Sequence, residues 1–196
     1  MPRRYELKER ARALEATRQR IVDATVALHQ EVGPARTTVA EVARRAGVGR
    51  VTVYNHFPDE TALLGACSAQ WAAANPPPDP AAWTAIENPA KRLRRALAEL
   101  YVYFGANEAM LANVTRDAPL VPALAEVLGA AGASDHERAM REALLSGRPL
   151  KGGRRRRAHA AVGLAISFAT WQRLTREEGL EDADAVKLMV RAIEAP

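Results

Sequence analysis

Residues 37–64 read TTVAEVARRAGVGRVTVYNHFPDETALL, a sequence in which two short helical patterns flank a glycine. In the first pattern Val42, Ala43 and Ala46 stand at i, i+1 and i+4, so they share one face of a helix. We therefore expect a short helix over residues 39–46, with this apolar face buried.

A glycine turn is expected to link this helix to a second one. Thr37 or Thr38 can cap the first helix, because a hydroxyl oxygen accepts an otherwise unpaired backbone N–H. Gly47 can supply the sharp exit, since glycine adopts the left-handed conformation without the penalty that a side chain brings. The second helix is then expected over residues 50–57.

This second helix has an inner and an outer face. Val53 and Phe57 stand at i and i+4 and form the inner face. Two short helices joined by a glycine turn, with hydrogen-bonding side chains on the outer face of the second, are typical of the helix-turn-helix that docks in the major groove of DNA. The residues left to the outer face are Arg50, Val51, Thr52, Tyr54, Asn55 and His56.

The stretch resembles the TetR family of bacterial transcriptional regulators over about residues 15–65. That family shows a Thr, an Ala-rich helix, an AGV turn, a T-hydrophobic-Y-x-H-F run, a Pro and a hydrophobic pair. The resemblance implies an all-α fold with an N-terminal three-helix helix-turn-helix domain and a C-terminal helical domain for ligand binding and dimerisation. The matching residues are Thr38, Ala43, Ala46, Gly47, Val48, Thr52, Val53, Tyr54, Asn55, His56, Phe57, Pro58, Leu63 and Leu64.

Three positions depart from the family pattern. The family often has Ser or Thr where Gly49 stands and Gly where Val51 stands, and it usually has a Lys where this chain has Glu60. That Lys commonly meets a DNA phosphate, which a carboxylate would repel. We therefore expect this contact to be lost.

Net charge is concentrated in the part of the chain that carries the motif. Residues 1–57 hold 11 Lys/Arg and 6 Asp/Glu, whereas residues 58–196 hold 17 of each, so the net charge of +5 belongs to the first segment. Neutralising phosphates requires cations there. A basic surface that is merely solvated is the alternative.

The motif also predicts a role for each exposed residue. Arg50 lies near the start of the second helix, where side chains reach base edges, and Arg pairs with guanine through two hydrogen bonds. Val51 and Thr52 can contact a thymine methyl group. Tyr54, His56, Thr38 and the helix start at Val39 resemble family positions that bond phosphates, and Arg44 and Arg45 near the turn can add phosphate contacts. The alternatives are a packed aromatic ring for Tyr54 and a capping or packing histidine for His56. The full predicted DNA-contacting set is Thr37, Thr38, Arg44, Arg45, Arg50, Val51, Thr52, Tyr54, Asn55 and His56.

Helical patterns extend on both sides of the motif. We expect a basic arm over residues 1–14 that either extends the first helix or stays mobile. Arg3 and Arg4 in this arm either reach an adjacent minor groove or belong to a frayed, solvated terminus. The DNA-binding domain is expected over 15–75, with helices at 17–32 and 58–74, and the helical ligand-binding and dimerisation domain over 81–196. Within that domain we expect helices at 90–106, 108–116, 121–128, 135–145, 154–178 and 182–193.

Two sets of apolar residues in the rest of the chain suggest further sites. The first set can line a ligand pocket or can be plain core, and the second can form a four-helix dimer interface or can pack within one chain. The pocket candidates are Trp71, Tyr101, Tyr103, Phe104, Met110, Val114, Phe168 and Trp171. The interface candidates are Val162, Ala165, Ile166, Ala169, Val186, Met189, Val190 and Ile193.

Other functional classes find little support in the sequence. There is no GxSxG, P-loop or GxGxxG motif, and the four histidines are scattered, so we expect no enzyme activity, cofactor or metal. Cys67 is the single cysteine, the first residues lack the apolar core of a secretory signal, and no apolar run approaches a membrane span, so we expect a cytoplasmic protein. Gly152 and Gly153 precede four arginines at the start of a helix, which can bind an anion or be a solvated helix end.

These observations predict a regulator that binds operator DNA as a homodimer. The expected mechanism is repression that a small apolar ligand relieves by changing the spacing of the two recognition helices. The alternative is a helical ligand-binding protein whose helix-turn-helix no longer binds DNA, and Gly49 and Glu60 are the residues that favour it. A nucleic-acid enzyme is opposed by the missing catalytic residues.

Overall fold

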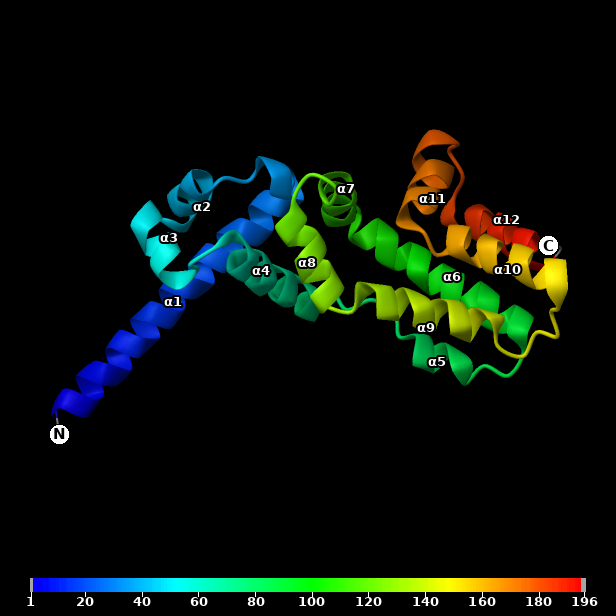
Figure 1. Ribbon diagram of the computed structural model, residues 1–196, viewed down its shortest axis with the longest axis horizontal. Helices are drawn as coiled ribbons and strands as arrows, with labels where there is room; N and C mark the ends of the chain where they lie inside the picture. The colour runs from blue at the N-terminus through cyan, green and yellow to red at the C-terminus, as the bar shows by residue number, and fades with distance from the viewer. Residues whose placement is uncertain (1, 195–196) are drawn as a thin grey trace. The chain divides into compact units, whose positions relative to one another are not determined.

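The computed structural model describes residues 2–194, with side chains from residue 8 onward. All regular elements within these residues are helices, which confirms the predicted all-α class (Figure 1). None of the described helices is both long enough and apolar enough to cross a membrane. The chain divides into two compact units: the N-terminal unit (residues 1–76 and 109–131) and the C-terminal unit (residues 77–108 and 132–196).

The N-terminal unit contains the predicted helix-turn-helix and the helices that support it. The motif helices are α2 (Val39–Ala46) and α3 (Arg50–His56); α2 packs on a much longer first helix, and α3 packs on α2. The other elements are α1 (Pro2–Glu31), the 3-10 turn η1 (Pro34–Arg36), α4 (Glu60–Ala74), α7 (Glu108–Asp117, from Ala109 on) and α8 (Pro122–Ala130).

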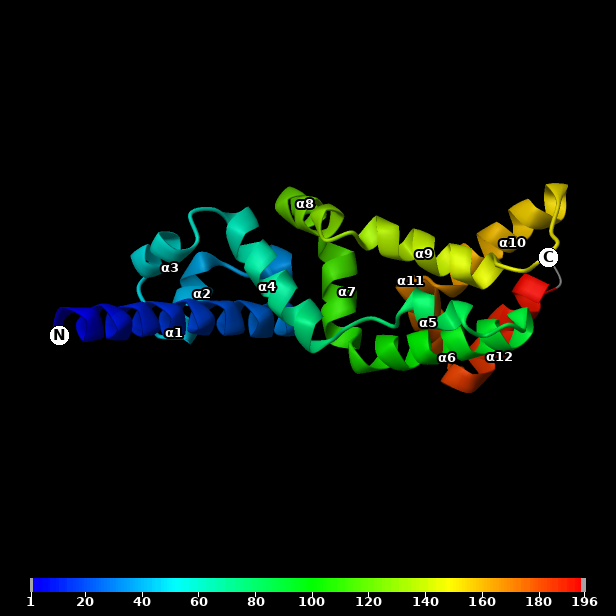
Figure 2. The same ribbon diagram turned by 90° about the horizontal axis from the view of Figure 1, so that it is seen from below.

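The C-terminal unit is built around the contact of its first long helix, α6 (Pro89–Ala106), with the last helix, α12 (Asp182–Glu194); both views show them near each other (Figure 2). Asn88 caps α6 by accepting hydrogen bonds from two backbone N–H groups, and a proline occupies the first turn, as is typical of helix starts. The other elements are α5 (Pro80–Thr84), α9 (Ala133–Leu145), α10 (Gly152–Ala165), α11 (Phe168–Gln172) and the π-helical turn η2 (Arg173–Glu177).

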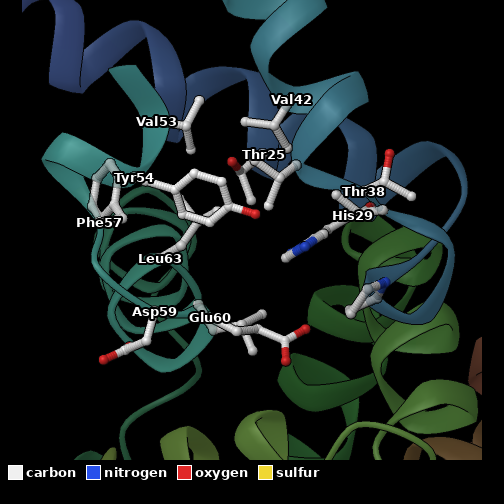
Figure 3. Close-up of a pocket in the computed structure, with 14 residues that line it drawn as sticks. Thr25, His29, Thr38, Val42, Val53, Tyr54, Phe57, Asp59, Glu60 and Leu63 are labelled. Atoms are coloured by element: carbon white, nitrogen blue, oxygen red, sulfur yellow. The ribbon is translucent and has the colours of Figure 1, made fainter. Parts of the chain in front are cut away.

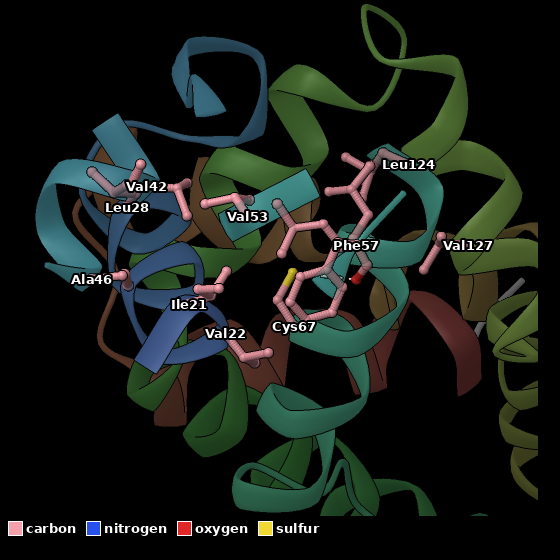
Figure 4. Packing of buried hydrophobic residues seen from close by; sticks show 14 of the residues in the cluster. Ile21, Val22, Leu28, Val42, Ala46, Val53, Phe57, Cys67, Leu124 and Val127 are labelled. Atoms are coloured by element: carbon pink, nitrogen blue, oxygen red, sulfur yellow. Dashed lines mark hydrogen bonds between the residues drawn. The ribbon is translucent and has the colours of Figure 1, made fainter. Parts of the chain in front are cut away.

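One apolar core holds the N-terminal unit together. Val53 and Phe57 of the motif point inward beside Cys67 of α4, and Leu124 of α8 closes the same cluster (Figure 4). Burial raises the pKa of the Cys67 thiol to about 12, so the sulfur stays protonated and neutral. Cys67 is therefore a small buried side chain of the core.

Four expectations about the elements need correction. The first helix begins at Pro2, well before residue 17, because residues 2–31 contain no internal helix breaker; the side chains of Arg3 and Arg4 lie outside the described ones. The fourth helix begins at Glu60, two residues after the expected Pro58. The helix α5 lies between the predicted helices at 58–74 and 90–106, where no helix is expected.

The expected long helix over 154–178 is broken. The helix α10 ends at Ala165, and the chain resumes helical structure at Phe168. The hydroxyl of Tyr101 donates a hydrogen bond to the carbonyl of Ala165 at 3.1 Å. In a continuous helix this carbonyl would accept the backbone N–H of Ala169. Residues 109–131, which lie within the predicted C-terminal domain, group with the N-terminal unit by their contacts.

Candidate nucleic-acid interface

Local interactions fix the two ends of α2. The hydroxyl of Thr38 accepts a hydrogen bond from the backbone N–H of Glu41 at 3.2 Å, so Thr38 is the cap. Thr37 instead donates its hydroxyl to the carbonyl of Gly33 at 2.9 Å. Gly47 has φ 67° and ψ 39°, the left-handed exit predicted from the sequence.

The helix α3 has a buried inner face and an exposed outer face, although Thr52 and His56 of the predicted outer face are half-buried. Val53 is 1% exposed and Phe57, just after the helix, is also buried. Val51 is 72% exposed and Tyr54 54% exposed, and Arg50 and Asn55 are exposed as well. The outer face of this helix is thus accessible to a large partner.

The start of α3 lacks a side-chain cap. Gly49 occupies the cap position with φ −78° and ψ 154°, and its backbone carbonyl accepts hydrogen bonds from Thr52 and Val53. The first-turn N–H groups therefore receive no hydroxyl oxygen from this position. Gly49 marks a position where the family pattern often has such an oxygen.

Two of the predicted phosphate-contacting arginines are paired within the unit. Arg44 bonds the carboxylate of Glu41 at 2.5 and 2.9 Å, and Arg45 bonds both carboxylate oxygens of Glu31 at 2.5 Å. Hydrogen bonds from these arginines lower the pKa of both glutamates, so the carboxylates stay ionised. Each arginine would have to share or release its partner in order to contact a phosphate.

Two side chains of α7 bond the end of α1, and a third bonds the turn that follows it. Asn113 donates to the carbonyls of His29 and Gln30, both at 2.9 Å. Arg116 donates to the carbonyl of Val32 at 2.9 Å. These carbonyls end a helix and would otherwise lack intrahelical partners. We call Asn113, Arg116 and Asp117 the α7 clamp.

Asp117 completes the clamp from a buried position. Its carboxylate accepts the backbone N–H of Ala35 at 3.0 Å and the guanidinium of Arg116 at 2.6 Å. The hydrogen bond from Arg116 lowers the pKa of Asp117 despite its burial. Gly33 has φ 93°, and a Cβ there would lie 2.2 Å from Arg116 Nη2, so this approach requires glycine.

The clamp could not be found by pattern reasoning. Its three residues show only that α7 has a polar face, because their partners are backbone groups about 80 residues earlier in the chain. The sequence does contain one signal, the Gly-Pro pair at 33–34, which marks a turn without indicating what packs on it.

The α4 start lies on the same side of the motif as Tyr54. Asp59 caps α4 by accepting the backbone N–H of Ala62 at 2.7 Å. The next residue, Glu60, is exposed and lines a cavity together with Thr38 and Tyr54 (Figure 3). The predicted phosphate contacts and the departure from the family pattern therefore occur in one place.

The pocket candidates are divided between the two units. Tyr101, Phe104, Phe168 and Trp171 form a cluster in the C-terminal unit, where Phe104 meets Phe168 edge-on with ring centroids 5.5 Å apart. Tyr103 contacts this cluster through Phe104. Trp71, Met110 and Val114 belong to the N-terminal unit, and Val114 packs on the core that contains Phe57. A pocket lined by the aromatic cluster stays a prediction.

Most of the interface candidates contact their own chain. Val162, Ala165 and Ile166 of the α10 segment are buried, as are Val186, Val190 and Ile193 of α12. Met189 is half-buried and Ala169 is exposed. Six of the eight side chains thus pack within the C-terminal unit. For these six the structure agrees with packing inside one chain, the alternative to a dimer interface. The large apolar side chains that remain exposed on these helices are Leu164 and Leu188.

Known proteins resemble the chain in its motif and in its fold. Residues 21–67 match the family model described as bacterial regulatory proteins, tetR family. The HTH-type transcriptional regulator BetI of Serratia proteamaculans (strain 568) is 45% identical over 49 residues, 25% of this chain and 25% of that protein. The match thus spans about a quarter of the length of this curated relative.

Solved structures extend the similarity to nearly the whole chain. A putative TetR-family transcriptional regulator from Mesorhizobium loti has a TM-score of 0.62 at 17% identity, over 93% of this chain and 95% of that chain. NalD of Pseudomonas aeruginosa, the secondary repressor of the MexAB-OprM multidrug efflux pump, has a TM-score of 0.60 at 21% identity, over 93% and 96%. At these identities the likeness concerns the fold. The chain thus carries the helix-turn-helix of the bacterial tetR family at residues 21–67, inside a fold that it shares with solved TetR-family regulators.

Proposed function

We propose that the chain is a DNA-binding transcriptional repressor. The observation that carries the proposal is the outer face of α3, where Arg50, Val51, Tyr54 and Asn55 are exposed while Val53 anchors the helix in the core. A helix held in this way can enter a major groove with its side chains already positioned.

The charge distribution supports the same function. The net charge of +5 lies in residues 1–57, which contain α1, α2 and α3. Cations beside the motif release counterions from the DNA backbone when they neutralise phosphates. They give affinity without sequence preference, and the outer face of α3 adds the preference.

We further propose that the repressor acts as a homodimer and is released by a small apolar ligand. Two half-sites on DNA require two copies of the motif. The exposed Leu164 and Leu188 would contribute to such a dimer. The aromatic cluster around Phe104 is the candidate ligand site.

The α7 clamp offers a route from ligand to motif. The chain passes from the C-terminal unit to the N-terminal unit at the first residue of α7, and the clamp residues follow in the same helix. They bond the end of α1 and the turn before α2. A shift of α7 would therefore act directly on the segment that positions the motif.

A gel shift with the DNA upstream of the chain's own gene tests the proposal. The wild-type protein should retard this DNA at lower concentration than a scrambled duplex of the same length, and Arg50→Ala should remove the difference. Equal retardation of both duplexes would contradict sequence-specific repression. No retardation at low salt would favour the alternative, a ligand-binding protein with a degenerate motif, to which Glu60 points.

A further inference from the structure

A cavity of about 190 Å³ lies inside the N-terminal unit, beside α3. Residues of α1, α2, α3 and α4 line it, and Figure 3 shows Val42, Val53 and Leu63 around its apolar part. The cavity is separate from the aromatic cluster of the C-terminal unit, which is the candidate site of the proposed repressor ligand.

The volume suits a small ring. An apolar cavity of about 150 Å³ inside a protein stays dry and binds a benzene-sized molecule. The cavity beside α3 is somewhat larger and also has polar groups at one side. It can therefore take a six-membered ring or a branched alkyl group that carries one polar substituent.

The polar side of the cavity favours a positive charge. No lysine or arginine is among its lining residues, all of which the structure describes. The ring of His29 points into the cavity (Figure 3), and burial lowers its pKa to about 4, although Asp117 opposes the shift. The imidazole is thus neutral near pH 7 and adds no positive charge.

One carboxylate remains for the ligand. Asp59 lines the cavity but turns its carboxylate to the backbone N–H of Ala62. The Glu60 carboxylate lies at the edge of the cavity, on the same side as His29 (Figure 3). A carboxylate beside an apolar surface without a neighbouring cation attracts a cationic group.

Tyr54 adds an aromatic face to the lining of the cavity. Its ring extends over the cavity in Figure 3, whereas Phe57 already has the guanidinium of Arg18 4.9 Å from its ring centroid. Cations bind over tyrosine rings through the quadrupole of the ring. A ligand ammonium between Glu60 and Tyr54 would gain both interactions.

We propose that this cavity binds a small organic amine, with its ring or alkyl group between α1, α3 and α4 and its ammonium group beside Glu60. The site goes beyond the proposed repressor function, because its occupancy can be measured on the protein without DNA.

Calorimetry with matched probes tests the site. The full chain is titrated with benzylamine and, separately, with benzyl alcohol, which has the same ring without the charge. Benzylamine should bind more tightly than the alcohol, by about twofold to fivefold, the range expected for an exposed ion pair. Equal affinities of the two probes, or heat from neither at millimolar concentration, would overturn the proposal.

Two variants and a control locate the binding. Glu60→Gln should weaken benzylamine by the same factor and leave benzyl alcohol unchanged, whereas Glu126→Gln, an equal charge change on the exposed face of α8, should alter neither. Val39→Phe places a ring in the cavity from a half-exposed position and should abolish the binding of both probes. If Glu126→Gln weakens benzylamine as much as Glu60→Gln, the effect is general charge and the site is wrong.

The effect on DNA is a separate measurement. Thr38 and Tyr54 line the cavity and are also predicted phosphate contacts, so a bound amine should raise the protein concentration needed for a gel shift. If benzylamine binds in the calorimeter but the protein retards no DNA, the proposed repressor is contradicted and the amine site is not. If the protein retards DNA but benzylamine does not bind in the calorimeter, only the amine site is contradicted.

Discussion

Arg50 and Tyr54 lie on one short helix, but they would contact DNA in different ways. Both are exposed, Arg50 in the first turn of α3 and Tyr54 one turn later. A guanidinium matches two acceptors of guanine, whereas a single hydroxyl donates equally well to any phosphate. Sequence preference should therefore depend on the first residue and general affinity on the second.

Substituting each residue separates the two roles. Arg50→Ala should cost about 1–3 kcal/mol of binding free energy on the preferred site and flatten the base preference. Tyr54→Phe should weaken binding to all sequences alike, because it removes only a hydroxyl. Fluorescence anisotropy with specific and scrambled duplexes measures both, and equal losses on the two duplexes for Arg50→Ala would contradict the assignment.

Glu60 should oppose DNA binding at the site where the family pattern has a Lys. Replacing it by Lys turns a repulsion into a contact that releases a counterion, so Glu60→Lys should tighten binding to any duplex. The slope of log affinity against log salt should steepen by about one unit. The Glu126→Lys variant is the control, and an unchanged affinity of Glu60→Lys at low salt would show that the α4 start is far from the phosphates.

Burial of His29 makes the N-terminal unit sensitive to acid. Its folded-state pKa of about 4 lies below the unfolded value of 6.5. Between these values the unfolded chain binds a proton that the folded chain excludes, so stability falls as pH drops from about 6.5 to 4. The loss should approach about 3 kcal/mol by pH 4.

Urea denaturation across this pH range measures the loss. The His29→Gln variant should show a flatter dependence on pH than the wild type. The His159→Gln variant changes an exposed histidine and should follow the wild-type profile. A His29→Gln profile parallel to the wild type would mean that other groups cause the acid sensitivity.

At the scale of single elements, the bounds of a helix could be predicted where local capping residues mark its ends. The bounds of α2 match the expected ones because Thr38 and Gly47 are local signals at its two ends. At the break after Ala165 the carbonyl bonds the hydroxyl of Tyr101, a residue 64 positions earlier, and no local pattern reports such a contact. The outer face of α3 could be predicted from the spacing of its own residues. The cavity and the clamp could not, because they form only when residues distant in sequence pack together.

The clamp also carries an element-scale prediction. Asn113→Ala leaves the carbonyls of His29 and Gln30 without their donor, so it should lower the free energy of unfolding by about 1–2 kcal/mol. Thr115→Ala, on the exposed face of the same helix, should change it by less than about 0.5 kcal/mol. Urea denaturation compares the two, and equal effects would show that the clamp adds nothing to stability.

At the scale of the whole molecule, the charge distribution separates the predicted DNA-binding segment from the rest of the chain. The net charge of the first 57 residues equals that of the entire protein, so the rest of the chain is electrostatically balanced. Composition alone could reveal this asymmetry. It could not reveal that residues 109–131 join the N-terminal unit, because that depends on α8 packing against α4.

DNA affinity should accordingly depend steeply on salt. Log affinity should fall linearly with log salt, with a slope of roughly −0.9 for each phosphate contact. Arg191→Gln removes an exposed cation from α12 and should leave this slope unchanged. A salt-independent affinity would contradict binding through the basic segment.

The buried sulfur of Cys67 gives the protein an internal reporter. The thiolate is the form of cysteine that attacks alkylating reagents, and a thiol whose pKa is about 12 in a closed core presents almost no thiolate. Labelling of the native protein must therefore wait for the N-terminal unit to open. Because this is the single cysteine, the labelling rate records the opening of that one unit. A DNA duplex or an amine that stabilises the closed unit should therefore slow the alkylation of Cys67 without contacting this residue.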